Sequence, residues 1–194
     1  MTALEREIVE LISHEGPITV ARYMGLCLGH PAHGYYVTRD PFGPQGDFVT
    51  APEISQMFGE LIGLWCAEVW RQMGSPGRVV LVELGPGRGT LMKDLLRAAK
   101  AVPGFRAALD VVLVETSPTL RDVQAGTLAE TGAAPRWAAT VEEALSAPAP
   151  AIVVANEFFD ALPIRQFVRT EAGWRERLVG LSGDRSLAFG LTIL

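Results

Sequence analysis

One stretch decides the fold of this chain: Val79-Val80-Leu81-Val82-Glu83-Leu84-Gly85-Pro86-Gly87-Arg88-Gly89-Thr90. A β-branched apolar run leads into an acid and a Gly-x-Gly-x-Gly turn, and a helical pattern follows from Leu91 to Arg97. A strand, a glycine turn and a helix in this order predict a nucleotide-type pocket, because bare backbone lets a ligand approach the start of a helix closely.

The spacing of the glycines favours one class of ligand. A dinucleotide fingerprint needs its third glycine three residues after the second, but the third glycine here is Gly89 and position 90 is Thr. The pattern acid-x-Gly-x-Gly-x-Gly, from Glu83 to Gly89, resembles the first motif of S-adenosylmethionine (SAM)-dependent methyltransferases. The alternative to a SAM site is a tight strand-to-helix turn that binds no ligand. An NAD-dependent dehydrogenase is disfavoured, because the glycine spacing differs from the dinucleotide fingerprint.

Length and composition indicate a globular chain with a substantial core, since it has 194 residues, of which 48% are hydrophobic and 20% charged. The formal net charge of −5 gives no electrostatic support for a nucleic-acid substrate. Cys27 and Cys66 lie within apolar helical patterns, which predicts buried thiols in a reducing compartment. No metal site is expected, because the histidines are not suitably spaced with these cysteines.

Targeting signals and membrane spans are not expected from the sequence. No apolar run reaches the roughly 18 residues that a membrane helix needs. The first ten residues are acidic, lack a signal core and differ from an acid-poor mitochondrial presequence. The expected setting is therefore a prokaryotic cytoplasm.

Strand and helix patterns alternate through the middle of the chain. After the strand at 79–84, the pattern predicts strands at 110–115, 136–139 and 151–155, with helices at 89–100, 118–130 and 140–146 between them. This alternation predicts an α/β fold with a doubly wound, mostly parallel, Rossmann-like methyltransferase sheet. Four strands of this sheet are visible where seven are usual, so we expect the chain to be a fragment truncated before the last sheet strands.

Helices and a loop precede this core. Helices are expected at 3–14 and, capped by Thr19, at 19–28, followed by a glycine- and proline-rich lid loop at 30–48. Thr50-Ala-Pro-Glu53 has capping-box spacing and opens a helix at 52–73. Its apolar stripe comprises Ile54, Met57, Phe58, Leu61, Ile62, Trp65, Val69 and Met73. This stripe is expected to pack on the sheet or on another subunit, which leaves the oligomeric state open, with a homodimer as one alternative.

The character of the chain changes after Pro163. Strands at 165–170 and 175–181 predict an antiparallel hairpin, and a third short strand is expected at 186–191. We therefore divide the chain into N-terminal helices and lid loop (1–78), a SAM-binding α/β core (79–163) and the start of an incomplete inserted substrate region (164–194).

The glycine turn supplies the first group of candidate ligand-binding residues. Backbone amides of Gly85, Gly87 and Gly89, together with Thr90 at the helix start, are expected to face the carboxylate and sugar side of SAM. Glu83 is expected to hydrogen-bond either the amine of the cofactor or a backbone amide in the turn.

Glu115 ends the second strand of the predicted sheet. An acid at this place can accept hydrogen bonds from both ribose hydroxyls of a nucleoside. The alternative is a first-turn carboxylate that the helix dipole favours, because Pro118 sits near the first helical position. We favour ribose binding, since the two signals occur in the expected order.

Three polar residues follow the strand at 151–155. Ligands of open α/β sheets bind beyond the carboxyl ends of the strands, so Asn156, Glu157 and Asp160 are placed where a methyl acceptor should meet the sulfonium. They are the candidate catalytic residues. In the alternative reading, Asn156 or Asp160 caps a short helix.

Four segments together resemble the MidA-type class I SAM-dependent methyltransferases, the family of the mitochondrial complex I assembly protein arginine methyltransferase. The segments are Ile18-Thr-Val-Ala-Arg-Tyr-Met24, Gly46-Asp-Phe-Val-Thr-Ala-Pro-Glu-Ile-Ser-Gln-Met-Phe-Gly-Glu60, Val82-Glu-Leu-Gly-Pro-Gly-Arg-Gly-Thr90 and Asn156-Glu-Phe-Phe-Asp-Ala-Leu-Pro163. The resemblance implies SAM as cofactor and transfer of a methyl group to an arginine of a protein substrate. It also implies that Gly46, Asp47, Pro52 and Glu53 approach the cofactor.

Arginine chemistry fits the acids of the chain. A guanidinium stays protonated and offers a planar fork of donors that a carboxylate can hold bidentately. Glu157 is the first choice for this role, with Asp160 or Glu53 as a partner. Two alternatives remain: a SAM methyltransferase acting on a small molecule or another side chain, and a SAM-binding assembly factor without activity in this truncated form.

Overall fold

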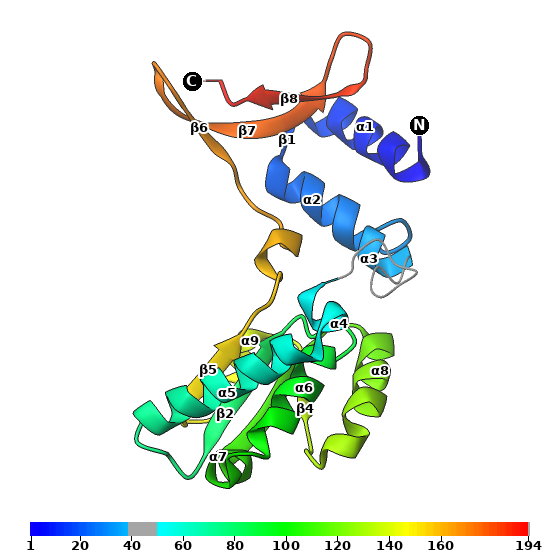
Figure 1. Ribbon diagram of the computed structural model, residues 1–194. Coiled ribbons are helices and arrows are strands. Elements are labelled where there is room, and N and C mark those ends of the chain that lie inside the picture. Colours follow the sequence, from blue (N-terminus) through cyan, green and yellow to red (C-terminus); the bar gives the residue numbers. More distant parts are fainter. Residues whose placement is uncertain (39–49, 194) are drawn as a thin grey trace. The chain divides into compact units, whose positions relative to one another are not determined.

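A computed structural model describes residues 1–38 and 50–193, which form two compact units (Figure 1). Unit 1 contains the described residues up to 38 together with 159–193, and unit 2 contains residues 50–158. This division differs from the predicted three-part division. The helices at 51–72 belong with the α/β core, and the C-terminal hairpin belongs with the N-terminal helices.

Unit 2 is built on a parallel sheet. Its strands are β2 (Val79–Leu84), β3 (Leu109–Val114), β4 (Arg136–Ala138) and β5 (Ala151–Val154), in the order β4-β3-β2-β5. All six residues of β2 are buried, as expected for a central strand of a parallel sheet that is covered on both faces. The predicted strands and the α/β fold class are confirmed.

Helices flank this sheet. They are α4 (Ala51–Ile54), α5 (Gln56–Gln72), α6 (Thr90–Ala99), α7 (Pro103–Ala108), α8 (Pro118–Leu128) and α9 (Val141–Ala144), with a 3-10 turn η1 at Ala129–Thr131. The single helix predicted at 52–73 is interrupted at Ser55, whose backbone is extended. The short helix α7 is not anticipated by the sequence pattern, because one turn and a half carries too little periodicity.

The face of α5 that packs on α6 is made of small residues. Gly59, Gly63, Cys66 and Ala67 are its buried positions, and a Cβ atom at Gly63 would lie 2.6 Å from the carbonyl oxygen of Leu95. Much of the predicted apolar stripe instead faces solvent within unit 2. Ile54, Met57, Leu61 and Trp65 are between 58% and 71% exposed. Because α5 and α6 approach closely, only small residues fit at their contact, and the large apolar side chains lie on other faces of α5.

Unit 1 combines helices with an antiparallel sheet. Its elements are α1 (Ala3–Glu15), β1 (Ile18–Thr19), α2 (Val20–Gly29), α3 (Tyr35–Thr38), a 3-10 turn η2 (Phe159–Ala161), β6 (Phe167–Thr170), β7 (Gly173–Leu181) and β8 (Leu187–Leu191). Strand β7 pairs antiparallel with β1, β6 and β8, which confirms the predicted hairpin and third strand. Thr19 caps α2 as predicted, since its hydroxyl accepts from the Arg22 amide at 3.1 Å.

A small apolar cluster holds unit 1 together. It consists of Ile8, Ile12, Ile18, Val20 and Val179. Within the part of the chain that the structure describes, no helix combines the length and the apolar character needed to cross a bilayer.

Candidate cofactor site

The turn between β2 and α6 has the conformation that its glycines allow. The φ angles of Gly85, Gly87 and Gly89 are +60°, +53° and +84°, in the left-handed region where a side chain is disfavoured. The Gly85 amide donates to the carbonyl of Val114 at 3.2 Å, and the Gly89 amide donates to the carbonyl of Pro86 at 2.8 Å. Both amides therefore donate hydrogen bonds within the fold, and the two glycines shape the turn.

The ring of Phe158 lies directly on this turn. A Cβ atom at Gly85 would lie 2.5 Å from Cδ2 of Phe158, a separation that real side chains do not show. Phe158 follows Glu157, so its contact fixes the segment after β5 against the segment after β2. The absence of a side chain at Gly85 is what allows this approach.

Glu83 lies at the base of the turn as a buried carboxyl. It is 3% exposed, and its Oε2 atom has no hydrogen-bond partner among the described residues. Its sheet neighbours are the apolar residues Leu113 and Val154. Burial raises the pKa of Glu83 to about 8. A buried acceptor without a partner is rare in folded proteins, which makes Glu83 a candidate functional residue.

Glu115 follows β3, and its carboxylate is held from two sides. The Ser117 amide donates to Oε1 at 2.8 Å, and the side-chain amide of Gln124 donates to Oε2 at 3.3 Å. Helix α8 is capped by the hydroxyl of Ser117, which accepts from the Leu120 amide at 3.4 Å. The helix thus has its own cap, and Glu115 is oriented as an acid at the carboxyl end of a strand, where nucleoside hydroxyls bind.

A second carboxylate reaches the start of α6. The Thr90 hydroxyl donates to Glu53 at 2.6 Å. The capping box predicted for Thr50 and Glu53 is wrong: Thr50 is the N-cap residue of α4, but its side chain makes no cap hydrogen bond. Glu53 instead reaches Thr90, and Pro52 beside it is buried. The structure therefore brings together two residues that the sequence analysis assigned to the cofactor.

The candidate acceptor residues follow β5. Asn156 is partly buried and Glu157 is exposed, both within unit 2. The φ angle of Glu157 is +48°, a strained value for a residue with a side chain, and such strain is often found at functional sites. Asp160 lies on η2 in unit 1, where it is exposed. Gly46 and Asp47 lie outside the described residues.

Sequence reasoning missed Gln124, which touches both the turn and Glu115. A single glutamine inside a helix carries no motif, and only the fold shows that it is completely buried. Within the described ranges, no group of three or more His, Cys, Asp or Glu side chains is arranged to hold a metal ion.

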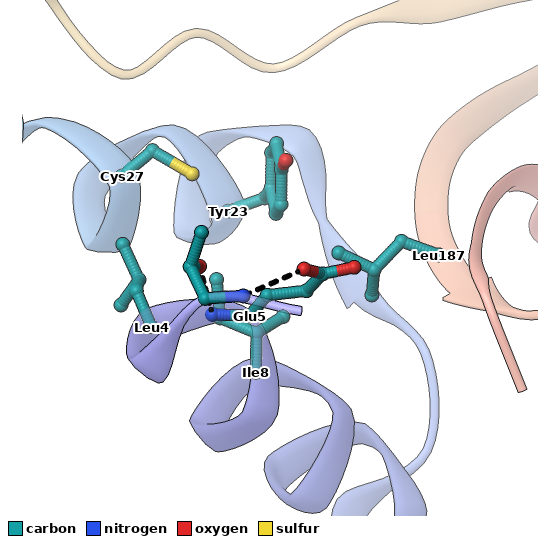
Figure 2. Close-up of a pocket in the computed structure, with 7 residues that line it drawn as sticks. Leu4, Glu5, Ile8, Tyr23, Cys27 and Leu187 are labelled. Atoms are coloured by element: carbon teal, nitrogen blue, oxygen red, sulfur yellow. Dashed lines mark hydrogen bonds between the residues drawn. The ribbon is translucent and has the colours of Figure 1, made fainter.

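Unit 1 has a surface pocket of its own, of about 260 Å³. Figure 2 shows its lining, which comes from α1, α2 and the start of β8 and consists of Thr2, Leu4, Glu5, Ile8, Tyr23, Cys27 and Leu187. Glu5 and Thr2 are already used in the capping box of α1. None of the residues predicted to bind the cofactor or the acceptor lines this pocket.

Comparison with curated proteins relates the chain to methyltransferases. A family model described as "Putative S-adenosyl-L-methionine-dependent methyltransferase" matches residues 61–193. The mitochondrial protein arginine methyltransferase NDUFAF7 of Danio rerio is 42% identical, over 92% of this chain and 47% of that protein. The Homo sapiens protein of the same name is 38% identical, over 93% of this chain and 46% of that protein. The chain thus spans about half the length of the curated relatives it matches.

A solved structure supports the same relationship. A protein from Burkholderia thailandensis with bound S-adenosyl-homocysteine matches with a TM-score of 0.78 and 29% identity, over 99% of this chain and 50% of that chain. The prediction of a prokaryotic cytoplasmic setting is wrong, because the curated relatives are named as mitochondrial proteins. The N-terminal composition on which that prediction rested does not identify the compartment. The resemblance seen in the four sequence motifs is confirmed, and the chain belongs to the family of S-adenosyl-L-methionine-dependent methyltransferases matched over residues 61–193.

Proposed function

We propose that this chain carries the cofactor site of an enzyme that transfers the methyl group of SAM to an arginine side chain of a protein. One observation carries the proposal: Glu83, whose buried carboxyl has an oxygen without a partner among the described residues, lies two residues before the first of three left-handed glycines. The S-adenosyl-homocysteine in the related solved structure and the names of the curated relatives support it. The sequence resemblance adds a link to the assembly of respiratory complex I.

The residues of unit 2 fit the groups of this cofactor. Glu83 offers an unused acceptor to an ammonium group or a hydroxyl, and Glu115 offers an oriented carboxylate to the ribose hydroxyls. The three glycines hold the left-handed conformation of the turn, and Thr90 with Glu53 lies at the start of α6. When bound, SAM supplies a methyl group activated by the positive charge of its sulfur.

Glu157 is the residue we assign to the acceptor. It is exposed, three residues after the end of β5 at the carboxyl end of the parallel sheet. Its carboxylate can accept two hydrogen bonds from a guanidinium, which orients one nitrogen for in-line attack, and it can accept the proton which that nitrogen loses. Glu53, which lies in unit 2 with Glu157, is the proposed second carboxylate.

Transfer of tritium from methyl-labelled SAM into proteins of a cell lysate tests the proposal. We expect a labelled protein band that yields methylarginine on acid hydrolysis. Label on small metabolites would contradict the protein acceptor, and saturable binding of S-adenosyl-homocysteine without any transfer would contradict the enzymatic assignment.

A pair of variants tests the role of Glu157. Glu157→Gln keeps the size of the side chain and removes the charge, so it should bind S-adenosyl-homocysteine like the wild type while losing most of the transfer. Glu130→Gln is the matched control, because it removes another exposed acid of unit 2 that is not assigned to the site. Full transfer by Glu157→Gln would remove Glu157 from the mechanism.

A further inference from the structure

Gln124 joins three segments of unit 2 through one side chain. The residue is 0% exposed on α8. Its Nε2 atom lies 2.8 Å from the carbonyl oxygen of Gly87 and 3.3 Å from Oε2 of Glu115. Its Oε1 atom lies 2.8 Å from the indole nitrogen of Trp137 on β4. The glycine turn, the end of β3 and strand β4 therefore meet at this amide.

The chemistry of the partners fixes the orientation of the Gln124 amide. An indole nitrogen only donates, so the atom facing Trp137 must be the amide oxygen. A backbone carbonyl and a carboxylate only accept, so the group facing Gly87 and Glu115 must be the NH₂. The arrangement satisfies both ends of a fully buried amide, and no flipped orientation would do so.

The contact with the turn is also steric. A Cβ atom at Gly89 would lie 3.5 Å from Cγ of Gln124, which shows that α8 packs directly against the last glycine of the turn. The other oxygen of Glu115 is held by the Ser117 amide. With Gln124 on one oxygen and Ser117 on the other, the plane of the Glu115 carboxylate is fixed relative to the glycine turn.

We propose that Gln124 is a positioning residue that sets the geometry between the glycine turn and Glu115, and thereby the recognition of the ribose hydroxyls of the cofactor. This inference rests on the proposed function. Gln124 acts through Glu115 and Gly87 rather than by touching the ligand. A purely structural role would weaken every ligand of the site equally, whereas a positioning role weakens the part of the affinity that depends on the ribose hydroxyls.

Calorimetric titration with S-adenosyl-homocysteine and with its 2′-deoxy and 3′-deoxy forms separates these roles. In the wild type, loss of a hydroxyl should weaken binding about tenfold, because a charge-assisted hydrogen bond to Glu115 is lost. Gln124→Met keeps the size of the side chain without its hydrogen bonds. It should weaken binding of S-adenosyl-homocysteine about tenfold and leave binding of the deoxy forms nearly unchanged, so that the discrimination disappears.

Thr131→Val is the matched control. Thr131 is buried in the same part of unit 2, and its hydroxyl bonds the Leu128 carbonyl and the Ala133 amide, away from the turn and Glu115. This variant should lose stability and keep the full discrimination. Glu115→Gln should lose the discrimination, and adding Gln124→Met to it should change affinity little further, because the two residues act as one unit.

Each outcome bears on the inference. Equal weakening of all three ligands by Gln124→Met, with the discrimination intact, would overturn the positioning role while leaving the proposed function standing. Absence of S-adenosyl-homocysteine binding by the folded wild type would overturn both. If Gln124→Met does not fold, Trp137→Phe removes only the indole donor that anchors Gln124. That variant should then lose part of the discrimination, and full discrimination in it would contradict the inference.

Discussion

The Thr90 hydroxyl donates a 2.6 Å hydrogen bond to the carboxylate of Glu53, across 37 residues of sequence. Thr90 is the first residue of α6 and follows the last glycine of the turn, so the bond ties α4 to the place where α6 begins. A charge-assisted hydrogen bond of this length is among the stronger kinds in proteins. It therefore joins two helices of unit 2 next to the glycine turn.

Removal of the Thr90 hydroxyl should show the contribution of this bond. Thr90→Val keeps the shape of the side chain and leaves the Glu53 carboxylate without its donor, so the free energy of unfolding should fall by about 1–3 kcal/mol. Thr90→Ser keeps the hydroxyl and should lie much closer to the wild type. Urea denaturation measures both, and equal stability of the two variants would contradict the contribution assigned to the bond.

Glu83 should make stability depend on pH. Burial raises the pKa of Glu83 to about 8 in the folded protein, whereas the pKa of a glutamate in the unfolded chain is near 4.5. Between these values the folded state holds the extra proton, so stability falls as pH rises, with a slope of up to about 1.4 kcal/mol per pH unit. This contribution to stability is complete below the pKa that Glu83 has in the unfolded chain, and it is lost above the pKa that Glu83 has in the folded protein.

Glu83→Gln removes this titration. Its free energy of unfolding should change less between pH 5 and 8 than that of the wild type, and the variant should gain relative stability toward the alkaline end of this range. If the free energy of unfolding changed with pH by the same amount in both proteins, Glu83 would not titrate between pH 5 and 8.

The contact between α5 and α6 should not tolerate a methyl group. At Gly63 a Cβ atom would lie 2.6 Å from the Leu95 carbonyl oxygen, and neither backbone can yield without moving a helix. Gly63→Ala should therefore destabilise the protein by about 1–3 kcal/mol. Gly126→Ala, on α8 with nothing within 4 Å, should instead gain up to about 1 kcal/mol from helix propensity. Thermal or urea unfolding of the two variants would show opposite signs.

Phe158 and Gly85 should be energetically coupled. In Gly85→Ala the new methyl group would clash with the Phe158 ring, and alanine would be strained at the φ angle of +60°. The variant should therefore be less stable and bind S-adenosyl-homocysteine more weakly. Combining it with Phe158→Leu relieves the clash but not the strain. The double variant should therefore be more stable than the sum of the single effects predicts, whereas strict additivity would indicate that the ring is not the obstacle.

Strong local patterns made the core of unit 2 predictable. The buried run at Val79–Leu84, the glycine turn and the helix after it follow from residue types alone, because Val and Leu favour a covered strand and the glycines permit left-handed angles. The strand that precedes Glu115 also follows from residue types, although it ends at Val114, one residue before the predicted end. These features depend on neighbours within a few residues.

Long-range contacts explain what sequence reasoning could not supply. The spacing of Thr50 and Glu53 predicts a capping box, but the Glu53 carboxylate accepts a hydrogen bond from Thr90, which is distant in sequence. Met57, Leu61 and Trp65 of the predicted apolar stripe face solvent on α5, because the glycines of this helix allow its close packing on α6. Gln124 carries no local signal, and its importance arises only where three segments meet.

Calorimetric titration of the folded chain with S-adenosyl-homocysteine tests the central claim most directly. The account predicts a saturable heat with one site per chain, unaffected by an excess of NADH and strongly reduced in Glu115→Gln. If circular dichroism shows folded protein and the titration gives no heat, unit 2 does not hold this cofactor and the assignment is contradicted.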